Sequence, residues 1–547
     1  MRGNSCHADF WSARCGCDAG PGQRGSGGPG VPIFLPPRGA ISDRAQRVPG
    51  FDHALGRSIT MRSHRYSSSA MPAMRLGVWL RFALLMLVAA CVFVYSPVAG
   101  ILAGLGSLVV LYRPALLMPL VVALLVWLPM RFIFSAQPAE LVSTAVMAND
   151  IETGDSVRQV TILALFGIGL LLLLRVRFEV GGSDALRWFF LFLPLALLSE
   201  LWSADPALTA RRTAVAICCT VFAAGMAVGY YGQHRQGGTL LVRHICVLGS
   251  LACAAVLVAA IAAGNFHLFD LGWRLGSFGR ENQFSWVAAL VFLAIWVTRH
   301  NRNIWHAAGI PLAILAVSGT ALLLSKSRTS LIATAAGLLT CEVLNARSKG
   351  RIAAVATVGC LLLALASSDS FGALWKRGAS DDALQTVSGR TELWDVVWRD
   401  VCAQPWLGYG YGAYWTSDRV HRGAVEWAPT SAHNGYLDIA AELGFTGLVI
   451  MFAFLAICWR NGWQLRSLDH SNHDIGVLLL SVITSFLVIN TGESYADALE
   501  YFPVLATLTL AFYVSYVCAK IGMTGASPAF LAGGPQPRTL TKLESQS

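Results

Sequence analysis

Long apolar runs are the feature that most constrains how this chain folds. From Leu76 onward, runs of roughly 15 to 22 mostly apolar residues recur, separated by short polar connections. A helix of about 20 apolar residues crosses the hydrocarbon core of a bilayer, which is about 30 Å thick. Hydrophobic residues make up 55% of the chain and charged residues only 13%, a composition unlike that of soluble domains. The sequence therefore predicts an all-α, polytopic membrane protein.

We expect a bundle of about 12–14 transmembrane helices, because two of about fourteen apolar runs are short for a span. The predicted spans are 76–95, 97–111, 115–134, 160–174, 188–201, 213–231, 245–263, 284–297, 304–324, 330–344, 352–367, 435–458, 475–489 and 501–518.

The two ends of the chain differ from this apolar middle. The N-terminal segment is rich in Gly, Pro, Arg and Ser and shows no periodic apolar face, so we expect it to be disordered. We leave open where within it the natural chain begins. The predicted division is a disordered tail (1–74), a first transmembrane part (75–367), a large outer loop (368–432), the last transmembrane helices (433–518) and a disordered cytoplasmic tail (519–547).

Basic residues in the connections indicate the orientation. Connections such as RVRFEVGGSDALR, TRHNRN and WRNGWQLR alternate with acidic ones that include Asp150 and Glu493. Because Lys and Arg hold short loops in the cytoplasm, both termini are expected there. Arg211 and Arg212 lie on the outer side against this rule, either as tolerated residues or as functional cations. The same distribution accounts for the net charge of +10 without a nucleic-acid partner.

No metal or cofactor site is predicted. The thirteen Cys residues include no CxxC pair and no Cys/His ligand spacing, and the outer loop lacks a DxD motif. The glycines of QPWLGYGYGAYW resemble a nucleotide-binding loop only superficially, because no strand precedes them and no βαβ unit surrounds them.

The connection from residue 368 to 432 is too long to be a simple turn and is rich in Trp, Tyr and Gly, so we expect a folded lid. Within it SGRTELWDVVWRD has helical spacing, which places Arg390, Trp394 and Trp398 on one face. Asp395 and Arg399 have the i,i+4 spacing of an ion pair.

Two interpretations of this helix remain open. It lies on the outer membrane surface with its Trp side down, or its aromatic and cationic side chains bind substrate. In the second case Trp394, and Tyr411 from the following GYGYGAYW segment, stack on sugar rings, while Arg390 offers a bidentate fork to phosphate.

The stretch TSAHNGYLDIAAELGFTGLVI brings polar residues to the mouth of an apolar helix. If a helix begins near Ser431, Asn434, Asp438 and Glu442 fall on one face at i, i+4 and i+8, with His433 beside them. Ionisable groups in spans are functional hypotheses by default. The structural alternative is that Asn434 caps the helix and that the carboxylates fix neighbouring segments.

Cationic residues from separate outer turns surround this stretch in the predicted topology. They are Arg274 and Arg280, Lys326 and Arg328, and Arg390 from the loop. Each arginine alone is explained as a membrane-interface anchor. Together they favour a site for a lipid that bears a diphosphate, whose charge on departure they stabilise.

These motifs resemble a known family. GRENQFSW ahead of one span, SKSRTSL opening another, SGRTELW in the outer loop and SAHNGYLDIAAELGFTGL after it are similar to the O-antigen ligase and polysaccharide polymerase (Wzy-type) family, most closely its exopolysaccharide-polymerase branch. The resemblance covers residues 274–448 in motif terms, and the other spans agree only in hydropathy.

The resemblance implies a metal-independent membrane glycosyltransferase in the bacterial inner membrane. Its donor is an undecaprenyl-diphosphate-linked oligosaccharide on the periplasmic face, and its acceptor is another repeat unit or the lipid A core. The implied catalytic residues are His433, Arg390 and Arg328. Arg274 and Arg280 compete for the remaining arginine position, and Trp394, Asn434 and Tyr411 are further expected substrate contacts. A flippase and a chain-length regulator of the same pathway are expected partners.

A transporter of lipid-linked sugars is the alternative from a different class. Against it, no internal repeat is evident, and the polar residues gather at one outer face rather than at the midplane.

Overall fold

The structure is a computed structural model, and it describes the chain in several stretches. These are residues 156–175, 184–232, 237–262, 264, 267, 273–275, 281–307, 309–346, 350, 390–416, 419, 430–467, 470–496 and 498–524. The chain divides into two units, Met1–Ser68 and Ser69–Ser547, and all described residues lie in the second. The predicted spans at 76–95, 97–111, 115–134 and 352–367 lie outside the described residues, as do the predicted N-terminal tail and residues 525–547 of the predicted C-terminal tail. Residues 519–524 of that tail are helical instead, because the last helix extends to Thr524.

All regular secondary structure among the described residues is helical, with no strand among them. The helices are α5 (Ser156–Arg175), α6 (Asp184–Leu198) continued by the 3₁₀ turn η5 (Ser199–Trp202), α7 (Pro206–Tyr231), α8 (Gly237–Ala262), α9 (Glu281–Thr298), α10 (Gly309–Leu324), α11 (Arg328–Asn345), α15 (Arg390–Ala403), α17 (Gly435–Arg466), α18 (His470–Ile489) and α19 (Phe502–Thr524). Every predicted span within this part of the chain is a helix, which confirms the all-α prediction for it.

Seven of these helices are long and apolar enough to cross a membrane: α6 with η5, α7, α8, α9, α17, α18 and α19. α5 and α10 contain shorter apolar stretches, Ile162–Leu174 and Gly309–Leu324. The chain is therefore a multi-pass helical membrane protein. The predicted total of 12–14 spans includes segments outside the described residues.

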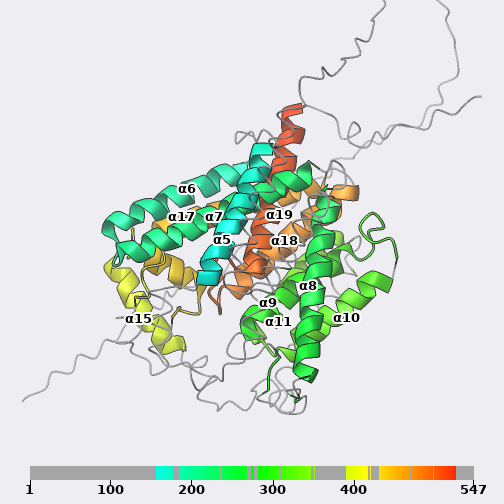
Figure 1. Ribbon diagram of the computed structural model, residues 1–547, viewed down its shortest axis with the longest axis horizontal. Helices are drawn as coiled ribbons and strands as arrows, with labels where there is room; N and C mark the ends of the chain where they lie inside the picture. Colours follow the sequence, from blue (N-terminus) through cyan, green and yellow to red (C-terminus); the bar gives the residue numbers. More distant parts are fainter. Residues whose placement is uncertain are drawn as a thin grey trace, which may run out of the picture. The chain divides into compact units, whose positions relative to one another are not determined.

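α18 and α19 form the centre of the bundle. In Figure 1 they lie between α5, α6 and α7 on one side and α8, α9, α10 and α11 on the other. The contacts agree, because α18 packs against α11, α17 and α9, whereas α19 packs against α7, α17 and α6. Apolar side chains of α18 and α19, such as Leu479 and Val514, are fully buried in the common core.

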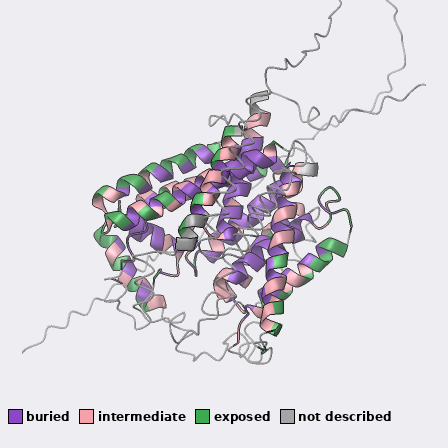
Figure 2. Ribbon diagram, viewed as in Figure 1, coloured by how far each residue is buried: buried purple, intermediate pink, exposed green. Residues whose placement is uncertain are grey.

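Apolar side chains are also exposed on the outer helices. Figure 2 shows exposed positions along α6 and α10, around a buried centre. Leu191, Leu198 and Leu201 of the α6–η5 segment and Leu312 of α10 are more than half exposed. Exposed apolar patches of this kind mark contact with a membrane or a partner, and here they suit lipid-facing surfaces of a bundle.

α15 forms where the SGRTELW pattern predicts a helix. Its buried face is Leu393, Val397 and Val401, which pack against α17. The predicted ion pair is wrong, because the Nε of Arg399 donates to the backbone carbonyl oxygen of Asp395 at 3.2 Å, and no ion pair joins the two side chains in this described helix. The i,i+4 spacing brings the residues together, but the carbonyl is the closer acceptor.

α17 breaks near its start, contrary to the expected continuous helix from Ser431. Asn434 is the N-cap, and Gly444 has φ 65° and ψ −166°, a backbone region open essentially only to glycine. A Cβ at this position would lie 2.3 Å from the carbonyl carbon of Trp406. The helix is thus a short segment, 435–443, and a long one, 445–466.

The outer-loop segment 404–416 docks into this break. The backbone N–H groups of Tyr409 and Gly410 donate to the carbonyl oxygens of Ala441 and Glu442, both at 2.9 Å. Helix carbonyls left without an intrahelical donor need such partners when buried. The glycines of GYGYG therefore permit close packing of the two backbones, and this is their structural role.

Candidate active site

Glu493 is the residue on which the polar groups converge. It lies in the segment after α18, and its side chain is 7% exposed. Its Oε1 accepts hydrogen bonds from Asn282 Nδ2 at 2.6 Å, Arg390 Nη2 at 3.2 Å and Thr329 Oγ1 at 3.5 Å. Its Oε2 lies 3.6 Å from His433 Nδ1. One buried carboxylate thus joins α9, α11, α15 and the turn before α17.

Arg390 and Arg328 begin two helices at this site. Arg390, the first residue of α15, also donates through Nη1 to the carbonyl oxygen of Gly492. Arg328 is the first residue of α11. Its pKa is lowered, mainly by burial and secondly by the positive charge of Arg390. Within the described residues, the side chain of Arg328 forms no hydrogen bond or ion pair. Its positive charge is therefore less well compensated than that of Arg390.

Arg274 reaches the same cluster through Asn282. Its Nε donates to the carbonyl oxygen of Ser325 at 2.9 Å, its Nη2 donates to Asn282 Oδ1, and its Nη1 lies 3.6 Å from Glu281 Oε2. Burial lowers the pKa of Arg274, while Glu281 and Glu493 act in the opposite direction. The structure therefore brings Arg274, Arg328 and Arg390 to one cluster. Arg280 lies outside the described residues.

His433 is held in an unusual backbone conformation. Its φ is +49°, a region that non-glycine residues seldom adopt. The side chain is 31% exposed, and Nδ1 lies 3.6 Å from Glu493 Oε2. A carboxylate at Nδ1 favours the tautomer with the proton there, which leaves Nε2 as the acceptor nitrogen.

Asn434 caps α17, one of the two roles expected for it. Its Oδ1 accepts from the backbone N–H groups of Tyr436 at 3.1 Å and Leu437 at 3.2 Å. It therefore ends the His433 turn and starts the helix, rather than lying on the helical face predicted with Asp438 and Glu442. Both carboxylate residues are buried in the short segment before Gly444.

Trp394 and Tyr411 contact the protein itself. Trp394 donates from its indole Nε1 to the carbonyl oxygen of Ala432 at 2.8 Å, directly before His433. Tyr411 is 3% exposed and packs edge-on against Phe192 of α6, with ring centroids 5.4 Å apart. Trp394 thus supports the His433 turn, and Tyr411 anchors the loop in the core.

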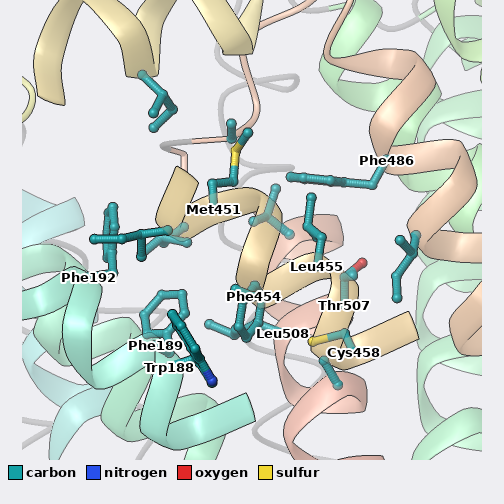
Figure 3. Close-up of a pocket in the computed structure, with 17 residues that line it drawn as sticks. Trp188, Phe189, Phe192, Met451, Phe454, Leu455, Cys458, Phe486, Thr507 and Leu508 are labelled. Carbon is teal, nitrogen blue, oxygen red and sulfur yellow. The ribbon is translucent and has the colours of Figure 1, made fainter. Parts of the chain in front are cut away.

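An apolar cavity lies between α6, α17, α18 and α19 (Figure 3). Aromatic and aliphatic side chains such as Phe192, Met451, Phe454 and Phe486 point into it. The cavity has a volume of about 70 Å³, which is below the roughly 300–1,000 Å³ typical of ligand pockets. Its lining includes Ala496, three residues after Glu493, so one segment contributes to both the polar cluster and the cavity.

Comparison with known proteins identifies the central part of this arrangement. Residues 313–452 match the family model described as O-Antigen ligase. The chain carries an O-antigen ligase family domain. It is 28% identical over 369 residues to the exopolysaccharide production protein ExoQ of Rhizobium meliloti. This alignment covers 62% of this chain and 80% of that protein. It is 29% identical over 178 residues to the O-antigen ligase of Pseudomonas aeruginosa, covering 32% of this chain and 40% of that protein.

The O-antigen ligase domain contains only part of the cluster. Arg328, Arg390 and His433 lie within residues 313–452, whereas Arg274 and Glu493 lie outside this range. The family and its relatives support a membrane enzyme of polysaccharide polymerase or ligase type. Arg274 and Glu493 thus complete the cluster from outside the matched residues.

Sequence reasoning missed Glu493 and Asn282 as site residues. Glu493 stood out only as an acidic residue of an outer turn, and Asn282 only as a letter of GREN. One signal was available for Glu493, because an acidic residue four positions after the end of an apolar helix must find donors near the membrane surface. Its actual donors come from segments more than 100 residues away.

Proposed function

We propose that this protein is an inner-membrane glycosyltransferase that transfers or polymerises undecaprenyl-diphosphate-linked oligosaccharide repeat units on the periplasmic face, in exopolysaccharide or O-antigen synthesis. The observation that carries the proposal is the cluster of three arginines and His433 around Glu493, next to an apolar cavity. The basic connections favour a cytoplasmic location for both termini. The similarity to the exopolysaccharide production protein ExoQ favours exopolysaccharide synthesis over ligation onto lipid A core.

The arginines suit the binding of a diphosphate. Arg274 and Arg390 each face a carboxylate, whereas Arg328 has the least compensation within the described part of the chain. An anionic group that enters the cluster would restore the charge balance beside Arg328 and Arg390. Guanidinium groups bind phosphate oxygens bidentately, and preorganised cations stabilise charge as it develops on a leaving group.

His433 suits the role of general base. The acceptor hydroxyl oxygen attacks the anomeric carbon, and its proton moves to Nε2 of His433. The bond between the anomeric carbon and the diphosphate oxygen breaks, and its electron pair leaves with the diphosphate. Glu493 at Nδ1 stabilises the imidazolium that results. Such direct displacement inverts the anomeric centre.

The apolar cavity, of about 70 Å³, suits a short apolar part of a lipid-linked substrate. Ala496 and Leu499 line the cavity, and Glu493 of the cluster lies in the same segment of the chain. The same cavity would serve a transporter, but the paired arrangement of a strained histidine and a buried carboxylate favours chemistry.

A deletion strain complemented with variants tests the proposal. Loss of a polymerase leaves single repeat units on the lipid carrier, whereas loss of a ligase leaves full-length polymer on it. Complementation with His433→Ala should reproduce the deletion phenotype, while Asp395→Asn, a carboxylate change on the exposed side of α15, should restore the polymer. Full transfer by purified His433→Ala, from a labelled lipid-linked donor extracted from the deletion strain, would refute the proposal.

A further inference from the structure

Asp438 is a buried carboxylate that the proposed reaction does not use. Its side chain is about 1% exposed. Oδ1 accepts from the backbone N–H of Ala432 at 2.9 Å and from the indole Nε1 of Trp415 at 2.7 Å. Oδ2 accepts from the hydroxyl of Ser494. These donors come from the turn before α17, the outer loop and the segment after α18, so one side chain ties three separate segments together.

The ties of Asp438 surround His433. The residue before it, Ala432, has its N–H bound by Asp438 and its carbonyl oxygen bound by Trp394. The residue after it, Asn434, donates its N–H to Ser494 Oγ at 3.1 Å. A non-glycine residue at positive φ is strained and persists only where its surroundings fix it. These bonds supply that constraint on both sides of His433.

Ser494 links this network to the carboxylate that faces the ring. It follows Glu493 directly, and its hydroxyl bonds both Asp438 and the backbone of Asn434. The position of Glu493 relative to His433 is therefore set by the same group that sets the His433 backbone. A shift of about 1 Å between such groups lowers catalysis by roughly 10²-fold.

We propose that Asp438 is a positioning residue that holds the His433 turn and the Glu493 segment in register, and so aims Nε2 of His433 at the acceptor hydroxyl. This inference rests on the proposed function, because it assigns His433 as the general base. Among the described residues, Asp438 forms no hydrogen bond or ion pair with the cluster arginines or Glu493. It acts through hydrogen bonds rather than through charge on the substrate.

The arrangement of donors gives a discriminating substitution. Oδ1 accepts two of the three bonds, so an amide oxygen in its place keeps both. The amide nitrogen then takes the Oδ2 position and donates to the hydroxyl oxygen of Ser494, which can reverse its role. Asp438→Asn therefore removes the negative charge and preserves the network, whereas Asp438→Ala removes the network.

The test compares kcat and donor KM of the purified full chain, with the labelled lipid-linked donor extracted from the deletion strain. Asp438→Ala should lower kcat by about 100-fold and change KM by less than about 3-fold, because the arginines are untouched. Asp438→Asn should stay within about 5-fold of the wild type. Equal losses in the Asn and Ala variants, a change in KM alone, or full activity of both would overturn the inference.

Smaller changes decide the matter if Asp438→Ala fails to accumulate in membranes. Ser494→Ala and Trp415→Phe each remove one donor to Asp438, and each should lower kcat by roughly 3- to 10-fold at constant KM. Unchanged kcat in both variants refutes the positioning role. Failure of the proposed function is a separate result, since it shows as full transfer by His433→Ala, whatever the Asp438 variants do.

Discussion

Replacement of Glu493 by Gln tests the centre of the proposed site. The change keeps the shape of the side chain and one acceptor oxygen, which can still receive Asn282 Nδ2 and Arg390 Nη2. It removes the negative charge that faces His433 Nδ1 at 3.6 Å. The histidine becomes cationic only as it takes the proton of the acceptor, so the lost interaction belongs mainly to the transition state.

The distance gives the magnitude. Two unit charges 3.6 Å apart interact by about 4.6 kcal/mol at an effective dielectric constant of about 20. The amide dipole of Gln and water around the partly exposed ring recover part of this, which leaves about 2–3 kcal/mol. At 1.36 kcal/mol for each factor of ten, kcat should fall by roughly 30- to 150-fold.

The assay is transfer from the labelled lipid-linked donor by purified protein, with Asp395→Asn as the matched carboxylate-to-amide control. A thermal midpoint in detergent reports folding, because loss of charge beside Arg390 also weakens a buried ion pair. Glu281→Gln, which faces Arg274 at 3.6 Å and not His433, should cost less than Glu493→Gln. A kcat for Glu493→Gln within about 3-fold of the wild type, at normal stability, would refute the role assigned to Glu493.

Four further outcomes follow from the structure. Arg328→Ala should lower transfer by about 100-fold or more, and Arg328→Lys by less, because Lys keeps the charge and loses the bidentate fork; equal transfer by wild type and Ala would contradict the diphosphate role. Gly444→Ala should destabilise the protein by about 2 kcal/mol or more, measured as a lower thermal midpoint, since its φ and the carbonyl of Trp406 exclude a Cβ. Transfer should be unaffected by EDTA, because the proposed leaving-group cations are arginines, and loss of activity restored by a divalent ion would contradict this. A polarity-sensitive fluorophore at Trp406→Cys should be quenched by spin-labelled lipids, and one at Glu392→Cys should not, because the exposed Trp406 ring packs on Phe445 at the start of the long α17 segment.

The helices were predictable because burial in lipid demands long apolar runs. Each predicted span within the described residues is a helix, with ends displaced by a few residues. The break at Gly444 was not predicted, because ELGFTGL continues the apolar pattern through it and the cause lies in a different segment. Only the docked backbone of Pro405–Gly410 shows why the helix opens there.

The arginines and the histidine of the site were predictable from the sequence, but Glu493, which joins them, was not. Arg328, Arg390 and His433 stand out because charged side chains beside apolar runs need a reason. The importance of Glu493 depends on which side chains reach it, and these come from four elements far apart in sequence. Trp394 shows the same limit. A Trp that stacks on a sugar ring and a Trp that donates a hydrogen bond to the backbone of Ala432 look the same in a sequence.

The break in α17 also makes the position of His433 independent of the thickness of the bilayer. As one continuous helix, its 32 residues would extend about 48 Å, and every mismatch with the hydrocarbon core would tilt the His433 end with it. Because the helix breaks at Gly444, about 22 residues, or about 33 Å, are left to match the core. The short segment that carries Asp438 is fastened instead to the outer loop and to the segment after α18, so membranes of different thickness can be accommodated below Gly444 while the histidine keeps its partners.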